Sequence, residues 1–171
     1  AWLRRQATLL PPDARPDTLA RLHESGNGCY ALTDDPSLAT PGLDRVLYES
    51  AWAPGESDSN VVIPAFDAEC HAVSLLTSGS TGAPQAHAKR WGTLVGDVAA
   101  PVPRLASLLG RDSLQGLTLV ATVPVQHSYG LESSVLLALL GGAAFDSGRP
   151  FFPADIAQAL AAVQRPRALV T

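Results

Sequence analysis

At its most informative point the sequence reads Thr77-Ser78-Gly79-Ser80-Thr81-Gly82-Ala83-Pro84, directly after an apolar, strand-like run at residues 72–76. The two glycines allow positive φ and a close approach of the backbone to a ligand. The four hydroxyl side chains and the backbone N–H groups are suited to binding phosphate oxygens, and the stretch holds no acidic residue to repel them. We therefore interpret residues 77–84 as a phosphate-binding loop; the alternative is a flexible connection of similar composition.

The composition is that of an ordinary globular domain. The 171 residues are 46% hydrophobic and 16% charged, and the net charge of −4 argues against a general nucleic-acid-binding surface. No apolar stretch has membrane-spanning length, and the N-terminus lacks the layout of a signal peptide. The two cysteines and four histidines lack metal-ligand spacing, so we expect free buried thiols, no metal-ligand set and a cytoplasmic location.

From residue 67 onward, short apolar strands alternate with helical patterns. We predict strands at 72–77, 117–123, 143–146 and 167–171, and helices at 89–99, 131–140 and 154–163. Pro101 and Pro103 should break or kink the helix that follows the loop, and Pro153 should lie at the start of the last helix. The alternation predicts an α/β fold with a mostly parallel sheet flanked by helices.

Residues 1–66 are less regular, and we expect an α/β lead-in to the core. Helical spacing occurs at 1–10 and 17–25, the second with Asp17 as its cap. The short apolar runs at 29–33 and 61–63 are strand candidates, and 46–48 is a further apolar run. Because the chain contains no methionine and ends in a strand-like run, we expect it to be the front part of a larger domain.

A second distinctive segment is Pro124-Val125-Gln126-His127-Ser128-Tyr129-Gly130-Leu131, which follows the strand predicted at 117–123. Ligands of open α/β sheets bind beyond the carboxyl ends of strands, so we expect this segment and the loop to face one crevice. His127 either contacts the ligand or closes a turn. Its neighbour Ser128 does not make a Ser–His catalytic pair with it, because adjacent side chains rarely point at one another.

The first segment resembles the phosphate-binding loop of the adenylate-forming superfamily of acyl- and aryl-CoA synthetases, Thr-Ser-Gly-(Ser/Thr)-Thr-Gly-x-Pro-Lys-Gly. Gln85 and Ala86 depart from the lysine and glycine of that pattern, and Lys89, the only lysine of the chain, is the candidate to replace the missing charge. The resemblance implies that the ATP phosphates are bound by Thr77, Ser78, Gly79, Ser80, Thr81, Gly82 and Lys89.

The second segment resembles the Pro-x-x-His-x-x-Gly-Leu motif of the same superfamily, which precedes an apolar helix ending in glycine. The resemblance implies that His127, as the catalytic-site residue, borders the carboxylate substrate and the path of the acceptor thiol. It also implies that Ser128, Tyr129 and Gly130 shape the acyl or aryl pocket.

Shorter matches at residues 89–92, 126–132 and 148–156 are similar to the compact AMP-ligases of aryl polyene and xanthomonadin-type pigment clusters, some of which activate 4-hydroxybenzoate-like acids. The implied reaction uses ATP and Mg²⁺ to convert a small carboxylic acid, aryl or fatty, into an adenylate and then a thioester. The implied acceptor is coenzyme A or the phosphopantetheine arm of an acyl carrier protein. The resemblance covers residues 67–171, and the family's adenine-binding motif and adenylation lysine lie downstream of the matched region.

Two other functions stay open at the level of sequence. Gln85 in place of the family lysine favours a non-catalytic nucleotide- or acyl-binding module built on the same fold. A purely structural α/β domain, in which residues 77–84 form an ordinary turn, is the third possibility.

Overall fold

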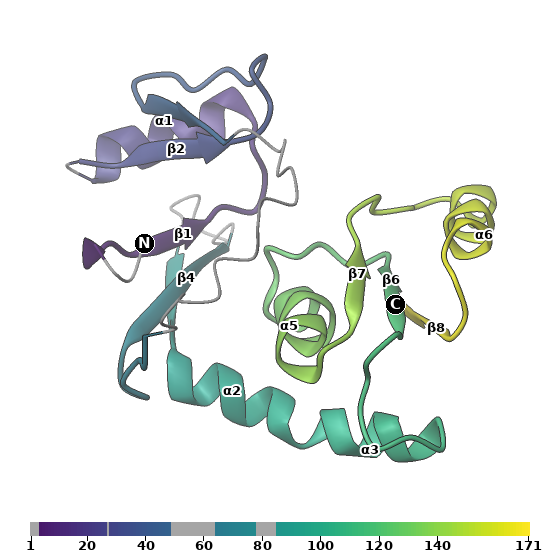
Figure 1. Cartoon of the computed structure of the whole chain (residues 1–171). Helices are drawn as coiled ribbons and strands as arrows, with labels where there is room; N and C mark the ends of the chain where they lie inside the picture. The colour runs from purple at the N-terminus through teal and green to yellow at the C-terminus, as the bar shows by residue number, and fades with distance from the viewer. Residues whose placement is uncertain (1–3, 27, 49–63, 78–84) are drawn as a thin grey trace, which may run out of the picture. The chain divides into compact units, whose positions relative to one another are not determined.

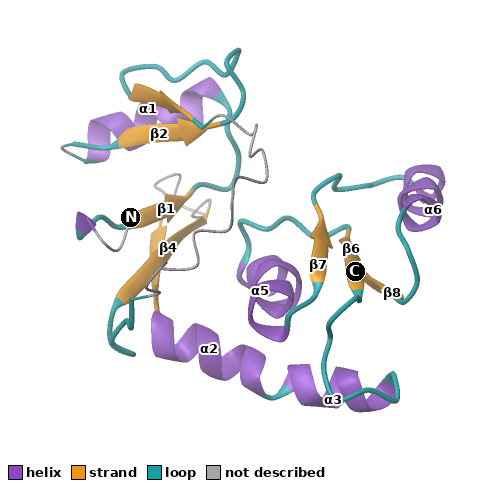
Figure 2. Ribbon diagram, viewed as in Figure 1, coloured by secondary structure: helices purple, strands orange, loops and turns teal. Residues whose placement is uncertain are grey.

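The computed structural model describes residues 4–26, 28–48, 64–77 and 85–171 (Figures 1 and 2). The chain forms two compact units: Pro11–Ala65 is one, and Ala1–Leu10 together with Phe66–Thr171 is the other. We refer to them as the small unit and the main unit. None of the helices in the described ranges is long and apolar enough to cross a membrane.

The small unit contains helix α1 (Pro16–Ser25) and strands β2 (Tyr30–Thr33) and β3 (Asp44–Leu47), which pair in parallel. The helix and the first strand confirm the predictions for 17–25 and 29–33. Asp17 was wrongly predicted as the cap: Arg15 holds that position, and Asp17 lies in the first turn behind Pro16. Proline suits this place because the first helical N–H groups need no intrahelical acceptor. The strand predicted at 61–63 lies outside the described residues.

The main unit begins with strand β1 (Thr8–Leu10), where the spacing at 1–10 predicts a helix. This prediction is wrong for the described residues, because Thr8–Leu10 pair in parallel with Val73–Leu75 of β4. Pairing with a buried strand outweighs a weak local helical pattern, and the two prolines at 11 and 12 stop any helix there.

Strand β4 (His71–Thr77) is the centre of a three-stranded sheet ordered β1-β4-β5. It confirms the strand predicted at 72–77, and its middle five residues are buried. Strand β5 (Gln85–Arg90) runs antiparallel to it, with Thr77 opposite Gln85. Strand β5 was not predicted, and the helix predicted from residue 89 begins two residues later, because this edge strand is mostly exposed and lacks the apolar pattern of a buried strand.

The second sheet of the main unit is parallel, in the order β7-β6-β8. Its strands are β6 (Thr118–Ala121), β7 (Ala144–Asp146) and β8 (Arg167–Val170), and α6 (Pro153–Ala162) precedes β8. These elements confirm the predicted alternation and the helix start at Pro153. The described strands form separate small sheets, where the sequence predicts one mostly parallel sheet. Strand β4 pairs with β1 and β5, whereas β6 pairs with β7 and β8, and no described strand joins the two sets.

Helices α2 (Trp91–Ala99) and α3 (Pro101–Leu108) follow one another and are separated at Ala100, as the prolines predicted. Residues 128–141 form one helical segment: α4 (Ser128–Gly130), the π-helical turn η2 (Leu131–Leu136) and α5 (Leu137–Gly141). The core joins both sheets through α2, because Leu94 and Val98 belong to the same buried cluster as β4 and β6. Cys29 and Cys70 are free, and both are half-buried instead of buried.

Candidate functional site

The predicted phosphate-binding loop connects β4 to β5. Ser78, Gly79, Ser80, Thr81 and Gly82 lie outside the described residues. The described ends of the loop are Thr77 and Gln85, which face each other across the antiparallel pair. The stretch 78–84 therefore connects the two strands of a β-hairpin. The pairing of β5 with the buried strand β4 keeps Thr77 and Gln85 opposite each other.

The first loop residue has a neighbour that the sequence analysis did not single out. Thr77 Oγ1 lies 3.3 Å from His87 Nε2, a hydrogen bond whose direction depends on the imidazole tautomer. His87 is exposed on β5, where its position next to the loop depends on the strand register Leu75↔His87. No spacing in the sequence predicts this contact, because it requires β5 to fold back along β4.

Lys89 lies on β5 and forms a half-buried ion pair with Glu132 of η2. Its Nζ donates to Glu132 Oε1 at 3.1 Å, and the two side chains are 26% and 23% exposed. Ser128 Oγ donates to the same carboxylate oxygen at 2.6 Å. The structure thus brings two predicted site residues, Lys89 and Ser128, together through a third residue, Glu132, that the sequence analysis missed.

The spacing of Ser128 and Glu132 was a usable signal. Residues four apart lie on one helix face, so a serine and a glutamate at this spacing can hydrogen-bond. The spacing does not predict that Lys89 pairs with Glu132, because these two residues are 43 positions apart in the sequence. In this structure the charge of Lys89 is compensated by Glu132, so a phosphate would compete with that carboxylate for the ammonium group.

His127 is exposed and occupies the cap position of α4. Its backbone N–H donates to the Pro124 carbonyl at 3.1 Å, and its own carbonyl accepts from the Leu131 N–H at 2.8 Å. These two bonds fix the turn between β6 and the helical segment. They place His127 beyond the carboxyl end of β6, where α/β sheets bind ligands.

Gly130 is buried where the helix packs beneath the 124–127 turn. A Cβ atom on Gly130 would lie 2.1 Å from the Pro124 carbonyl oxygen and 2.7 Å from its carbonyl carbon. Only glycine permits this close approach, which gives the residue a packing role. Tyr129 is 55% exposed, and its hydroxyl donates to the Thr171 carbonyl at 3.2 Å.

The helix after this turn is widened into a π-helix at η2. Ser133 and Ser134 donate their hydroxyl groups to the carbonyls of Tyr129 and Gly130. Such back-bonding competes with the backbone ladder and is associated with bent helices. Single π-turns inside α-helices occur frequently at functional sites.

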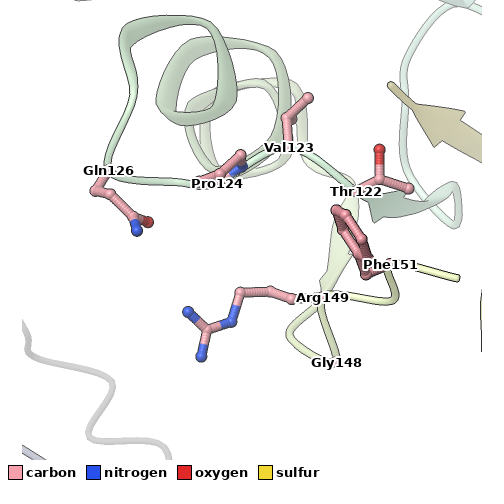
Figure 3. A pocket seen from close by; sticks show the side chains of 7 residues that line it. All are labelled: Thr122, Val123, Pro124, Gln126, Gly148, Arg149 and Phe151. Carbon is pink, nitrogen blue, oxygen red and sulfur yellow. The ribbon is translucent and has the colours of Figure 1, made fainter. Parts of the chain in front are cut away.

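A cavity of about 390 Å³ lies beside the 124–127 turn (Figure 3). Its lining residues are Thr122, Val123, Pro124, Gln126, Gly148, Arg149 and Phe151. None of the residues 127–130 lines it. Across the described ranges, no three His, Cys, Asp or Glu side chains are grouped as metal ligands.

Comparison with known proteins supports the fold assignment. The chain matches no protein-family model and no curated protein. It is similar to VinN in a complex structure with L-aspartate, at 23% identity and a TM-score of 0.58 over 81% of this chain. It also matches the McyG A-PCP structure complexed with phenylalanyl-adenylate, at 18% identity and a TM-score of 0.43 over 69% of this chain.

The likeness to VinN shows that the two chains share an α/β fold over the matched region. The chain spans 40% of the VinN chain and 17% of the McyG chain.

Proposed function

We propose that this chain supplies the phosphate-binding part of an enzyme that activates a carboxylic acid with ATP. The observation that carries the proposal is the glycine- and hydroxyl-rich stretch 77–82, which leaves the carboxyl end of the buried strand β4 in a fold similar to that of VinN. Loops at the carboxyl ends of strands are where α/β folds bind ligands.

In this proposal the loop from Thr77 to Gly82 binds the β- and γ-phosphates through backbone N–H groups and hydroxyls. Lys89 lies two residues beyond His87 on β5. In this proposal its ammonium group leaves the ion pair with Glu132 and binds a phosphate oxygen instead. Mg²⁺ would bind to phosphate oxygens of ATP. The ion would neutralise charge on the phosphates.

The chemistry has two half-reactions. A carboxylate oxygen attacks the α-phosphorus and pyrophosphate leaves; a thiol then attacks the carbonyl carbon and AMP leaves. Alignment of reactants contributes more to such a transfer than covalent help from side chains. His127 is the residue we assign to the border between the acid and the thiol, with Ser128 and Tyr129 beside it and Gly130 packing the turn that positions all three.

The substrate we propose is a small carboxylic acid. VinN was solved with L-aspartate, which belongs to that class. The matches at residues 89–92, 126–132 and 148–156 favour an aryl acid such as 4-hydroxybenzoate, as in pigment biosynthesis, with a fatty acid as the alternative. The acceptor is coenzyme A or the phosphopantetheine arm of an acyl carrier protein.

One observation favours a second function, a module that binds a nucleotide or acyl group without catalysis. Gln85 stands at the loop's end without a charge, and Lys89 is already paired with Glu132. A polyphosphate at the loop would then meet no uncompensated lysine.

Carboxylate-dependent exchange between ATP and pyrophosphate tests the two functions, with the chain alone and within the polypeptide that its gene encodes. Adenylation predicts exchange with an aryl acid. The double variant Ser80→Ala/Thr81→Ala should weaken ATP binding at least about tenfold, from the loss of two hydrogen bonds to charged oxygens. The matched control Thr93→Ala/Ser107→Ala removes two exposed hydroxyls elsewhere and should leave binding unchanged.

The outcomes separate the hypotheses. ATP binding that needs the loop, without exchange in either polypeptide, favours the binding module. ATP affinity that is unchanged in the Ser80/Thr81 variant contradicts adenylation and nucleotide binding at this loop, because both require phosphate contacts there, and leaves only a module that binds an acyl group.

A further inference from the structure

The cavity beside the 124–127 turn has the features of a binding site, and its charged residue, Arg149, has no role in the proposed reaction. Its volume of about 390 Å³ lies within the range of about 300–1,000 Å³ that is usual for small-molecule sites. Thr122, Val123 and Pro124 follow β6, and Gly148 and Arg149 follow β7, the parallel neighbour of β6. The cavity therefore lies at the carboxyl end of the parallel sheet.

Arg149 brings to this cavity a positive charge that no carboxylate of the described residues compensates. Among the described residues its guanidinium has no hydrogen bond and no ion pair. The nearest carboxylate in sequence, Asp146, instead accepts a hydrogen bond from the Gly148 N–H at 3.1 Å. A planar, always charged guanidinium with free donors matches the geometry of carboxylate and phosphate groups.

The backbone at Arg149 is held in an unfavourable conformation. Its φ is +48°, in the left-handed region that favours glycine, and the next residue is the buried Pro150. A residue before proline is further restricted toward extended conformations. Such outliers are unfavourable and concentrate at functional sites.

The other walls complement a charged ligand that also has an apolar body. Figure 3 shows the Gln126 amide and the Arg149 guanidinium extending into the same open space from different walls. Val123, Pro124 and Phe151 are apolar residues that line the same cavity. Phe151 is 75% exposed, and a ligand packed against its ring would remove this apolar surface from contact with water.

We propose that the Arg149 pocket binds an organic anion, with a carboxylate or phosphate group on the guanidinium and an aromatic or other apolar body against Phe151. The inference does not depend on adenylation, because none of the lining residues belongs to the stretch 77–84 and the binding requires no nucleotide. The two oxyanions share this recognition chemistry.

Equilibrium binding of four small probes to the chain tests the proposal by calorimetry, without ATP. Benzoate and phenyl phosphate carry the same ring with a carboxylate or a phosphate; benzamide keeps the ring without the charge; inorganic phosphate keeps the charge without the ring. We expect benzoate or phenyl phosphate to bind at least about tenfold more tightly than benzamide and inorganic phosphate, because both parts of the site contribute.

Three variants assign the binding to the pocket. Arg149→Gly removes the guanidinium at a φ that glycine adopts freely, so the melting temperature should not fall while anion affinity drops at least about tenfold. Arg149→Lys keeps the charge but loses the bidentate fork, and should give an intermediate affinity. The control Arg104→Ala removes an exposed arginine of α3 that has no ion pair among the described residues, and should bind like wild type.

The tighter of the two ring-bearing anions identifies the oxyanion that the pocket selects. Equal affinities of Arg149→Gly and wild type, benzamide binding as tightly as benzoate, or no saturable binding of either anion would each overturn the proposal.

Discussion

The substitution Gly130→Ala separates close packing from helix propensity, because the two make opposite predictions. Gly130 has helical dihedral angles, with φ −64°, so propensity alone favours alanine by about 1 kcal/mol. Close packing predicts the reverse: the added Cβ would lie 2.1 Å from the Pro124 carbonyl oxygen, and the 124–127 turn would have to move away by about 1 Å. Since the obstacle is backbone, we assign the clash a cost of about 3 kcal/mol or more.

The net loss of unfolding free energy is therefore about 2 kcal/mol or more, which for a chain of this length lowers the melting temperature by about 4–8 °C. Gly96→Ala in α2 is the matched control, because a Cβ there meets nothing within 4 Å. It should raise stability by up to about 1 kcal/mol. Thermal and urea unfolding followed by circular dichroism measures both variants, and a Gly130→Ala protein as stable as wild type would refute the reasoning.

Three further predictions concern the core, the ion pair and pH. Leu119→Ala empties a fully buried site in the central strand β6 and should cost about 2–5 kcal/mol in urea unfolding, and a cost below about 1 kcal/mol would show that β6 is not central to the core. A double-mutant cycle of Lys89→Ala and Glu132→Gln should give a coupling of about 1 kcal/mol for this half-buried pair, whereas additive effects would mean that the pair is absent in solution. A hydrogen bond from Arg15, followed by one from Thr18, holds the pKa of the Asp13 carboxyl well below its usual range. The Asp13 carboxylate therefore stabilises the small unit at pH values above the ordinary aspartate pKa, and this stabilisation is lost as the pH falls toward the lowered pKa. Between pH 6 and 3 the melting temperature should fall more steeply with decreasing pH for wild type than for Asp13→Asn. Parallel curves of melting temperature against pH would contradict this.

The elements that the sequence predicted well share a local cause. Proline removes a backbone donor and fixes φ, so the break at Ala100 and the helix start at Pro153 depend only on nearby residues. The apolar runs of β4, β6 and β8 are likewise visible one strand at a time. The phosphate-binding residues of the loop stay a prediction, since five of them lie outside the described residues.

The elements that the sequence missed depend on partners far along the chain. Strand β5 has an exposed, weakly apolar sequence and exists because β4 offers it a ladder of hydrogen bonds. The helix predicted at 1–10 gives way to β1 for the same reason. Propensity is a weak local preference, and pairing with a buried strand exceeds it.

By itself, the sequence determined the alternation of strands and helices and the places where helices break or begin; that two segments bind phosphate and acid stays a prediction from it. The tertiary structure alone decided that the strands divide into separate sheets, that Lys89 meets Glu132 across 43 residues, and that Arg149 opens toward Gln126 at the end of β6. Strand register and helix packing place these side chains together, and both are set by contacts between segments whose separation along the chain leaves no periodic trace in the sequence.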